Sequence, residues 1–546
     1  MHQTPPSIFL ADVYVQEPDV SVIRVLLDNF LPHASEFGFF LSTSRFYNAA
    51  LVPAPAGHVT RPLPALLFAV YLFGVHLSRT DSSQAQSSTF LNQALQTLSV
   101  ALTSGHPQRV LHTIQTHVLL SYFFYRSGLN IEAKYHAAAA CSLVISSGLH
   151  KVRSPSAYPG AIGESPIQTS SILLHKPVAD AIEEGERISA LWSTFALSRL
   201  LAVVLDPPDA ICGVFDVPGV QIDTPWPLTM KEYEDGAMPE TLQSTATVRN
   251  FVTNNDWYSG DGSSGAALFA KAVILIHRAA YVAGLFSDRA CRVLPSFTRT
   301  DAASLAMSQQ DYQTVSSLFT ATHSLLCGFR EQLPPLIVHA PPLLAYGAAF
   351  MPHPSSPPPQ DPALRTLLLT HNLMNAAFIK LHMPFFRSDP VSRQHCVAAA
   401  QAMFDFGNVD IRRFHCLNPI VGVRSLVLFT SFPPTNALQT LWTLAVQVLI
   451  DEVVRLRTAW AGAHSLPGGV VPYDATEDGQ LLRAEEEAYL GPLRLGIQAL
   501  LAFADASALM SMHSLLAAAD LSDIAADLLP IEMQAEEYKN LSANVQ

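Results

Sequence analysis

Apolar residues that recur at three- and four-residue steps are the feature that most constrains the fold of this chain. Residues 90–102 carry one such stripe and residues 110–122 the next, a spacing that places the apolar side chains on one face of a helix. Residues 130–147 predict a third helix, in which a run of alanines allows close helix contact. Strand patterns are weak, because residues 214–222 alternate poorly and contain a Pro-Gly pair. The sequence therefore predicts an all-α protein.

Glycine and proline residues indicate where these three helices begin and end. We expect Gly105 to cap the first helix, Gly128 the second and Gly148 the third, because glycine readily adopts the left-handed conformation that closes many helices. Pro107 suits the first turn of the second helix, where its missing N–H costs no hydrogen bond. Helices joined by such short turns are expected to pack as antiparallel neighbours.

Composition favours a folded chain and argues against direct binding of nucleic acid. Hydrophobic residues make up 49% of the 546 residues and charged residues only 14%, the opposite of a disordered composition. The formal net charge is -13 and no dense run of Lys and Arg occurs, whereas a protein that binds phosphate backbones needs a basic face.

The termini, cysteines and apolar runs predict an intracellular protein with no membrane span. The N-terminus lacks the basic and apolar regions of a secretory signal, so we expect reduced and mostly buried cysteines. The longest apolar run, residues 63–77, is shorter than the roughly 20 residues of a membrane span and predicts a core helix. The cysteines are Cys141, Cys212, Cys291, Cys327, Cys396 and Cys416.

Four stretches rich in small and turn-forming residues punctuate the helical pattern. Clusters of Ser, Pro and Gly end regular structure, so we expect connectors or subdomain edges there. They are residues 153–169, 254–265, 351–362 and 461–478.

One of these connectors contains the spacing of a dinucleotide-binding loop, in Gly260, Gly262 and Gly265. That motif binds a dinucleotide only where it follows a strand and opens a helix. Residues 251–256 make a poor buried strand, so we interpret the glycines as a flexible loop.

A group of carboxylates, Glu183, Glu184 and Glu186, lies beside Arg187. Carboxylates that converge in a pocket can perform acid–base or metal chemistry. Here they precede an apolar helical stripe, and acidic residues in a first turn favour the positive end of the helix dipole. We favour a helix start in which Arg187 holds a neighbouring residue, and keep a helical enzyme as the alternative.

The twenty histidines are scattered through the chain and form no recognised motif. Examples are His112, His117, His150 and His382. We interpret them as ordinary core or surface residues, and expect no metal ligand, cofactor or catalytic residue in this chain.

Several motifs follow one another in an order that resembles one family. They are Phe-Gly-Phe-Phe-Leu from Phe37, Pro-Ala-Leu-Leu-Phe from Pro64, Gln-Thr-His-Val-Leu-Leu from Gln115, Ser-Gly-Leu-His from Ser147, Glu-Gly-Glu-Arg-Ile from Glu184, Leu-Trp from Leu191 with Arg199 after it, and Ile-Asp-Thr-Pro-Trp-Pro-Leu from Ile222. Together they resemble the middle homology region of fungal zinc-cluster transcription factors, also called the fungal-specific transcription factor domain. The resemblance is strongest over residues 25–235.

The resemblance implies an all-α, multi-helix regulatory domain of antiparallel packed helices with long loops. It would comprise an N-terminal half over residues 1–240 and a C-terminal half over residues 241–460. Residues 461–546 would add a loop and C-terminal helices. Within them, residues 517–537 mix acidic and apolar side chains, which is typical of an activation segment and equally of an amphipathic terminal helix.

The same resemblance implies a nuclear protein, not an enzyme, that controls RNA polymerase II transcription through coregulators, a second copy of the chain or a ligand. A lipophilic-ligand receptor is the alternative. The motif residues expected to be structural or regulatory are Gly148, Leu149, His150, Glu184, Gly185, Glu186, Arg187, Trp192, Arg199, Asp223 and Pro225.

In this family DNA is bound by an N-terminal module in which six closely spaced cysteines hold two zinc ions. The closest cysteines here are Cys396 and Cys416, so we expect zinc and DNA binding only in full-length relatives. Either the gene model is truncated or this relative has lost its DNA-binding module. Ser198 is a second departure, because relatives often place an acid before the arginine.

Overall fold

A computed structural model describes residues 17–78, 83–155, 178–206, 215, 220–254, 262–293, 309–336, 362–404, 441–466, 469–470 and 476–504. Within these ranges the chain is helical, which confirms the predicted all-α class. The β-structure described there is one short antiparallel ladder between β1 (Ser465–Leu466) and β2 (Gly469–Val470).

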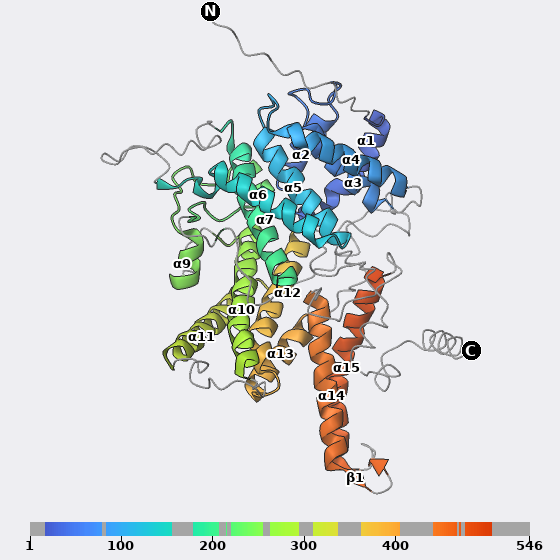
Figure 1. Cartoon of the computed structure of the whole chain (residues 1–546), viewed down its shortest axis with the longest axis vertical. Coiled ribbons are helices and arrows are strands. Elements are labelled where there is room, and N and C mark those ends of the chain that lie inside the picture. Colours follow the sequence, from blue (N-terminus) through green and yellow to red (C-terminus); the bar gives the residue numbers. More distant parts are fainter. Residues whose placement is uncertain are drawn as a thin grey trace, which may run out of the picture.

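The helices fall into an upper and a lower group that share one long helix (Figure 1). The upper group is α1 (Val20–Phe30), the 3-10 helix η1 (Leu31–Phe37), α2 (Thr43–Ala50), α3 (Pro64–Leu77), α4 (Ser83–Ala101), α5 (Arg109–Arg126), α6 (Asn130–Ser146) and η2 (Leu149–Lys151). The shared helix is α7 (Ala181–Leu205), which packs against α5 and α6 on one side and α10 on the other. It is followed by α8 (Met230–Glu234) and α9 (Thr247–Asn254).

The lower group continues the helical packing toward the C-terminus (Figure 1). It consists of α10 (Gly265–Val293), α11 (Gln309–Gln332), α12 (Pro362–His382), η6 (Met383–Phe385), α13 (Pro390–Ala402), α14 (Leu441–Ala463) and α15 (Glu477–Ala504). α12 packs along α10, while α13 links α12 to α14.

Residues 63–77 form a core helix, as predicted. Pro64 opens α3 at a position where its missing N–H costs no hydrogen bond, and the side chains from Ala65 to Val75 are all buried. A helix that is apolar on every side has to be enclosed by other elements. α3 is enclosed by α1, α4 and α5.

Two of the predicted helix ends are confirmed and two are wrong. Gly128 and Gly148 adopt left-handed backbones, with φ of 77° and 73°, directly after α5 and α6. Gly105 lies beyond the end of α4 at Ala101, where backbone turns close the helix without it. Pro107 precedes Gln108, the N-cap of α5, and so lies outside the helix. The pairing of neighbours also differs in part, because α4 packs mainly on α3, although α5 and α6 pair as expected.

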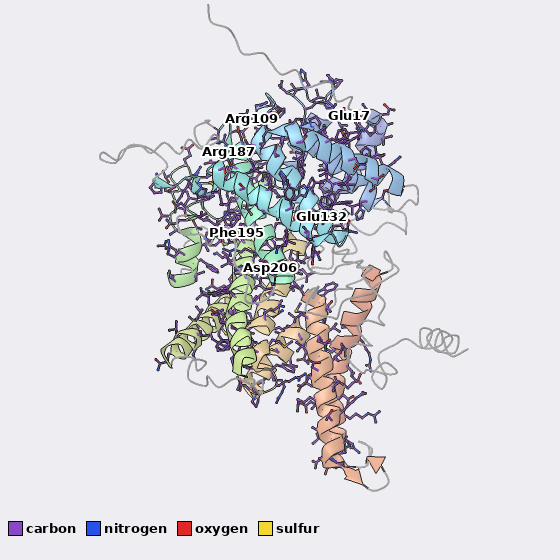
Figure 2. All side chains as sticks on the ribbon, viewed as in Figure 1. Glu17, Arg109, Glu132, Arg187, Phe195 and Asp206 are labelled. Atoms are coloured by element: carbon purple, nitrogen blue, oxygen red, sulfur yellow. The ribbon has the colours of Figure 1, made fainter. Side chains whose placement is uncertain are left out.

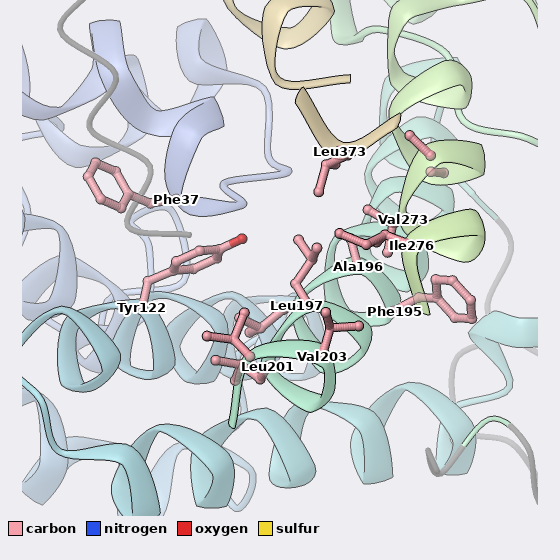
Figure 3. Close-up of a cluster of buried hydrophobic side chains, with 14 of the residues drawn as sticks. Phe37, Tyr122, Phe195, Ala196, Leu197, Leu201, Val203, Val273, Ile276 and Leu373 are labelled. Atoms are coloured by element: carbon pink, nitrogen blue, oxygen red, sulfur yellow. The ribbon is translucent and has the colours of Figure 1, made fainter. Parts of the chain in front are cut away.

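One contiguous hydrophobic cluster extends from Ile23 in α1 to Leu493 in α15. At its centre, Leu197 and Leu201 of α7 lie among residues from both groups, including Val273 of α10 and Leu373 of α12 (Figure 3). The two groups are therefore joined by shared burial of apolar surface, which is the main stabilising contribution to such a fold.

Two helices are long and apolar enough to cross a membrane, namely Ala181–Leu205 and Gly265–Phe286. Their most apolar windows are 78% and 72% buried inside the protein. Both helices lie at the centre of the helical body, so their apolar character is accounted for by contacts with other helices.

The crossing of α1 and α3 gives a test of this packing. A Cβ atom on Gly74 would lie 2.4 Å from the backbone oxygen of Leu26, so Gly74→Ala should force the two helices apart. We expect a loss of about 1–3 kcal/mol in the free energy of unfolding, measured by denaturant titration. Gly105→Ala is the matched control, because nothing lies within 4 Å of its added Cβ, and it should change stability by less than about 0.5 kcal/mol. Equal effects of the two substitutions would contradict the close crossing.

Candidate functional site

The first turns of α7 hold the charged group predicted to start a helix. Asp180 is the N-cap, and its side chain accepts a 2.9 Å hydrogen bond from the N–H of Glu183. Glu183 and Glu184 lie in the first turn, next to the positive end of the helix dipole. The helix-start interpretation is confirmed, although these side chains are more buried than ordinary first-turn acids.

Each of the three carboxylates turns to a different partner. Glu183 forms a buried ion pair with Arg187, 3.0 Å from oxygen to nitrogen, so Arg187 holds its neighbour as predicted. Glu184 accepts two hydrogen bonds, of 2.7 and 2.8 Å, from the guanidinium of Arg153. Glu186 accepts a 2.9 Å hydrogen bond from the backbone N–H of Ser42. The convergence that motivated an enzyme hypothesis does not occur among these described residues.

Arg153, the partner of Glu184, has an unusual backbone conformation. Its φ is 58°, a region that side chains other than glycine rarely adopt. Besides the ion pair with Glu184, its guanidinium donates to the backbone oxygens of Pro239 and Leu242. These bonds join the segment after η2 to α7 and to the segment after α8.

Glu186 connects α7 to the start of α2. Burial raises the pKa of its carboxyl to about 7, although the hydrogen bond from Ser42 and the charge of Arg45 both favour the ionised form. Ser42 is also the N-cap of α2, so one carboxylate fixes the beginning of that helix against α7.

A glycine is required at position 185 because another side chain approaches the backbone closely there, and not because of its backbone angles. A Cβ atom there would lie 2.4 Å from Cγ of Tyr233, the buried aromatic residue of α8. The Tyr233 hydroxyl accepts a 3.1 Å hydrogen bond from the N–H of Leu228. The glycine therefore allows α8 and the loop before it to lie directly on α7.

The motif at residues 148–150 meets the motif at residues 222–228 through its backbone. The carbonyl of His150 accepts hydrogen bonds from the N–H groups of Asp223, at 2.9 Å, and Thr224, at 3.3 Å. The carbonyl of Leu149 accepts a 2.6 Å hydrogen bond from the Thr224 hydroxyl. Gly148 supplies the left-handed turn that exposes these carbonyls.

Asp223 is a buried carboxylate that is fully hydrogen-bonded. It is only 2% exposed, and its oxygens accept four hydrogen bonds of 2.7–2.8 Å from Lys151, Ser154, Gln221 and the N–H of Ala246. Burial opposes its ionisation, but the bonds from Ala246, Lys151 and their neighbours outweigh burial and lower its pKa to about 2. An aspartate in this state organises a loop and does not transfer protons near neutral pH.

Trp192 and Arg199 extend the contacts along α7. The Trp192 indole donates a 2.8 Å hydrogen bond to the carbonyl of Pro225 and stacks on Trp226, with ring centres 4.8 Å apart. The Arg199 guanidinium lies over the Phe195 ring at 5.1 Å and 3.0 Å from Nε2 of His277 in α10. Figure 2 shows Arg187, Phe195 and Asp206 marking the course of α7 from the upper group toward the lower one.

The predicted motif residues therefore belong to one polar and aromatic network around α7. Sequence reasoning missed two of its members, Ser42 and Arg153, and recognised Gln115 only as the first residue of a motif. Gln115 lies in the apolar centre of α5, where its side chain accepts a hydrogen bond from the N–H of Phe40 at 2.7 Å and donates to the carbonyl of Gly38 at 3.3 Å. An amide inside an apolar stripe is a sequence signal for such a buried partner.

The glycine motif near residue 262 does not have the setting of a dinucleotide site. The element that precedes it among the described residues is helix α9 rather than a strand, and α10 begins at Gly265. The Lys271 ammonium donates a 2.8 Å hydrogen bond to the carbonyl of Gly262 and so ties this turn to α10. Residues 255–261 of the predicted loop, including Gly260, lie outside the described residues.

Most histidines among the described residues fit the ordinary interpretation, but one cluster of them does not. His117 is buried and His112 is partly buried, and desolvation lowers the pKa of His112 to about 3 and that of His117 to about 4. His382, however, meets His323 and His395 in a cluster whose nitrogen atoms lie within 4.8 Å of one another, a group that could hold a metal ion. Burial, helped by the two neighbouring imidazoles, lowers the pKa of His382 to about 4.

The cysteines whose side chains are described are free thiols. Cys141 and Cys396 are buried and Cys327 is partly buried, in agreement with the prediction that the cysteines are mostly buried. Burial raises the pKa of the Cys141 thiol to about 11, so it is protonated and unreactive near neutral pH. The side chains of Cys212, Cys291 and Cys416, and the acidic C-terminal stretch, lie outside the described residues.

The fold and the network define an all-α domain whose sequence motifs hold its helices together. Residues 39–217 match the family model described as the fungal specific transcription factor domain. The chain therefore contains a fungal-specific transcription factor domain, as its motifs predicted, and the match runs from the segment before α2 to the segment after α7. Comparisons with curated proteins and with solved structures gave no match.

The unusual ionisation of Glu186 predicts a pH-dependent stability. Its pKa rises from 4.5 to about 7 on folding, so folding takes up a proton between these pH values. The stabilising contribution is therefore present below pH 4.5 and is lost as the pH rises through 7. Glu186→Gln should leave stability nearly unchanged at pH 4.5 and increase it by up to about 3 kcal/mol at pH 8, measured by urea unfolding.

Glu240→Gln provides the control for this measurement, because Glu240 is exposed. We expect it to differ from the wild type by less than about 0.5 kcal/mol at both pH values. A Glu186→Gln variant that parallels the wild type across the whole pH range would show that the Glu186 carboxyl has an ordinary pKa.

Proposed function

We propose that this chain is the regulatory region of a fungal-type transcription factor, which controls RNA polymerase II transcription in the nucleus through contacts with protein partners. The match of residues 39–217 to the fungal specific transcription factor domain is the observation that carries this proposal. In this proposal the chain is not an enzyme, and its motif residues hold the helices that present a contact surface.

An exposed apolar patch at the start of α6 supports the proposed partner contact. Ile131 is 82% exposed and Tyr135 is 65% exposed, and their i, i+4 spacing places them on one face of the helix. Leu129, which precedes the helix, is 44% exposed. Exposed apolar groups of this kind are typical of protein interaction sites. We call these three residues the α6 patch.

The opposite face of α6 anchors the helix in the core. Ala133, Ala137 and Cys141 are buried, and α6 packs against both α5 and α7. Small side chains on that face bring the helix close to its neighbours, so the backbone that carries the patch is already fixed by packing before a partner binds. We assign the patch to a coregulator or a second copy of the chain.

The net charge argues against contact between this chain and DNA. With 45 acidic against 32 basic residues, this chain would be repelled by a phosphate backbone. DNA would be contacted by a zinc-cluster module of the kind found in full-length relatives. We further propose that residues 1–240 and 241–460 are the two halves of the regulatory domain, with residues 461–546 as a C-terminal extension.

A tethering experiment tests the proposed regulation. The chain is fused to an unrelated DNA-binding domain and assayed on a reporter gene in fungal cells. We expect the fusion to change reporter transcription relative to the DNA-binding domain alone, and Ile131→Asp with Tyr135→Asp to abolish most of that change, because carboxylates in the α6 patch would have to be desolvated in the interface. Protein levels and nuclear location are measured in parallel.

Leu481→Asp is the matched control for these substitutions. Leu481 is 69% exposed on α15, away from α6 (Figure 1), so its substitution should leave the reporter response intact. A wild-type fusion with no effect on transcription would refute the regulatory function. A response that survives in the double variant would refute only the assignment to the α6 patch.

A further inference from the structure

Three histidines from three different helices meet in the lower group of the fold. His323 belongs to α11, His382 to α12 and His395 to α13. Nδ1 of His323 lies 3.0 Å from Nε2 of His382, and the His395 ring lies 5.0 and 4.6 Å from those of His323 and His382. Helices α11 and α13 each pack against α12, so the cluster is a product of tertiary packing.

In His323 and His382, one ring nitrogen faces the cluster and the other, which we call the outer nitrogen, points away from it. Each outer nitrogen has a partner that orients the ring. Nδ1 of His382 lies 3.1 Å from the hydroxyl of Ser392 in α13, which turns Nε2 toward His323. Nε2 of His323 lies 3.5 Å from Sγ of Cys327, which turns Nδ1 toward His382. Partners on the outer nitrogen are what metal-binding histidines commonly have, because they fix the tautomer and the ring orientation.

We propose that His323, His382 and His395 form a binding site for a divalent transition metal ion, with Zn²⁺ as the ion that best suits them. Neutral imidazole nitrogens are preferred ligands of Zn²⁺, and three protein ligands with an open fourth position are a common zinc arrangement. Tetrahedral bonds of about 2.0–2.1 Å place the ligand nitrogens about 3.3 Å apart. The nitrogens here lie within 4.8 Å of one another, so small rotations of the rings suffice.

Access and charge at the cluster are compatible with a bound cation. His382 is buried, whereas His323 and His395 are partly exposed, so an ion can enter from their side. The carboxylate of Asp389 favours a positive charge near His382 and His395. The positive charge of the Arg330 guanidinium disfavours a second positive charge near His323. The guanidinium itself packs over the Phe378 ring, 4.6 Å from its centre.

A pair of histidines elsewhere in the fold provides a comparison for the three-histidine cluster. His117 and His136 approach each other with their Nδ1 atoms 2.9 Å apart, inside the upper group. No third His, Cys, Asp or Glu joins them within metal-binding distance among the described residues. The three-histidine cluster is therefore the candidate that offers enough ligands. It is also separate from the cysteine cluster of the family's DNA-binding module.

A metal ion at this position would have a structural consequence. It would link α11, α12 and α13, of which α12 is the helix that runs along α10. Binding to the folded state alone would stabilise the lower group in proportion to the logarithm of the metal concentration. The open fourth position would be filled by water or by an external ligand.

The site is tested on the purified full chain after treatment with a chelator. Zn²⁺ or Co²⁺ is added, unbound metal is removed, and bound metal per chain is measured by elemental analysis. We expect one ion per chain, the visible spectrum of tetrahedral Co²⁺, and an increase of several degrees in the unfolding midpoint with Zn²⁺. No retained ion, or a Co²⁺ spectrum of an octahedral hydrated ion, would overturn the proposal.

Substitutions identify the ligands. His323→Gln and His395→Gln change partly exposed residues, so folding, checked by circular dichroism, should be preserved while the bound ion and the thermal shift are lost. His371→Gln on the same helix as His382 is the control, because His371 bonds the carbonyl of Pro334 instead, and it should retain both. Metal binding that persists in both ligand variants would assign the ion to another site and overturn the proposal.

The positioning role of Ser392 has its own expected result. Ser392→Ala removes the partner of the His382 outer nitrogen and should weaken Zn²⁺ binding about 10–100-fold while leaving the stoichiometry at one. An unchanged affinity would show that the hydroxyl does not orient the ring.

Discussion

The burial of charged side chains along α7 is the constraint on which the arrangement of the other elements depends. An unpaired charge in a protein interior costs several kcal/mol, so Glu183, Glu186 and Arg187 require partners wherever the helix is enclosed. Burial of its apolar side chains places α7 at the centre of the fold. Only segments that offer partners to its polar groups can then pack beside it. Apolar burial supplies most of the stability, while these polar contacts select one arrangement among many compact ones.

Much of the helical pattern could be predicted because it depends on neighbours in the sequence. The bounds of α6 and the left-handed turns at Gly128 and Gly148 follow from apolar spacing and from the conformational freedom of glycine. Gly105 was assigned to a helix end for the same reason, but backbone turns after Ala101 had already closed α4. A glycine marks a position at which a helix can end, but the helix can also end before it.

The site was predictable only where motifs had been recognised as a set. Glu186 and Asp223 were identified by their place in the motif order, but their partners Ser42 and Ala246 could not be, because those contacts are backbone N–H groups with no side-chain signature. The histidine cluster was even less predictable from the sequence. Its members are separated by 59 and by 13 positions, so nothing local distinguishes His323 from any other surface histidine until α11, α12 and α13 are packed.

Arg153 illustrates how such a network restricts the evolutionary paths open to the sequence. Its backbone angle favours glycine, yet a glycine there would leave the Glu184 carboxylate without its bidentate partner and release two backbone oxygens. Replacement of Arg153 alone therefore removes the donors of one carboxylate and of two backbone oxygens, and replacement of Glu184 alone removes the ion pair of the guanidinium. Positions 153 and 184 should therefore be replaced together in descendants of this sequence, and the Pro239 and Leu242 carbonyls would then need a donor from elsewhere.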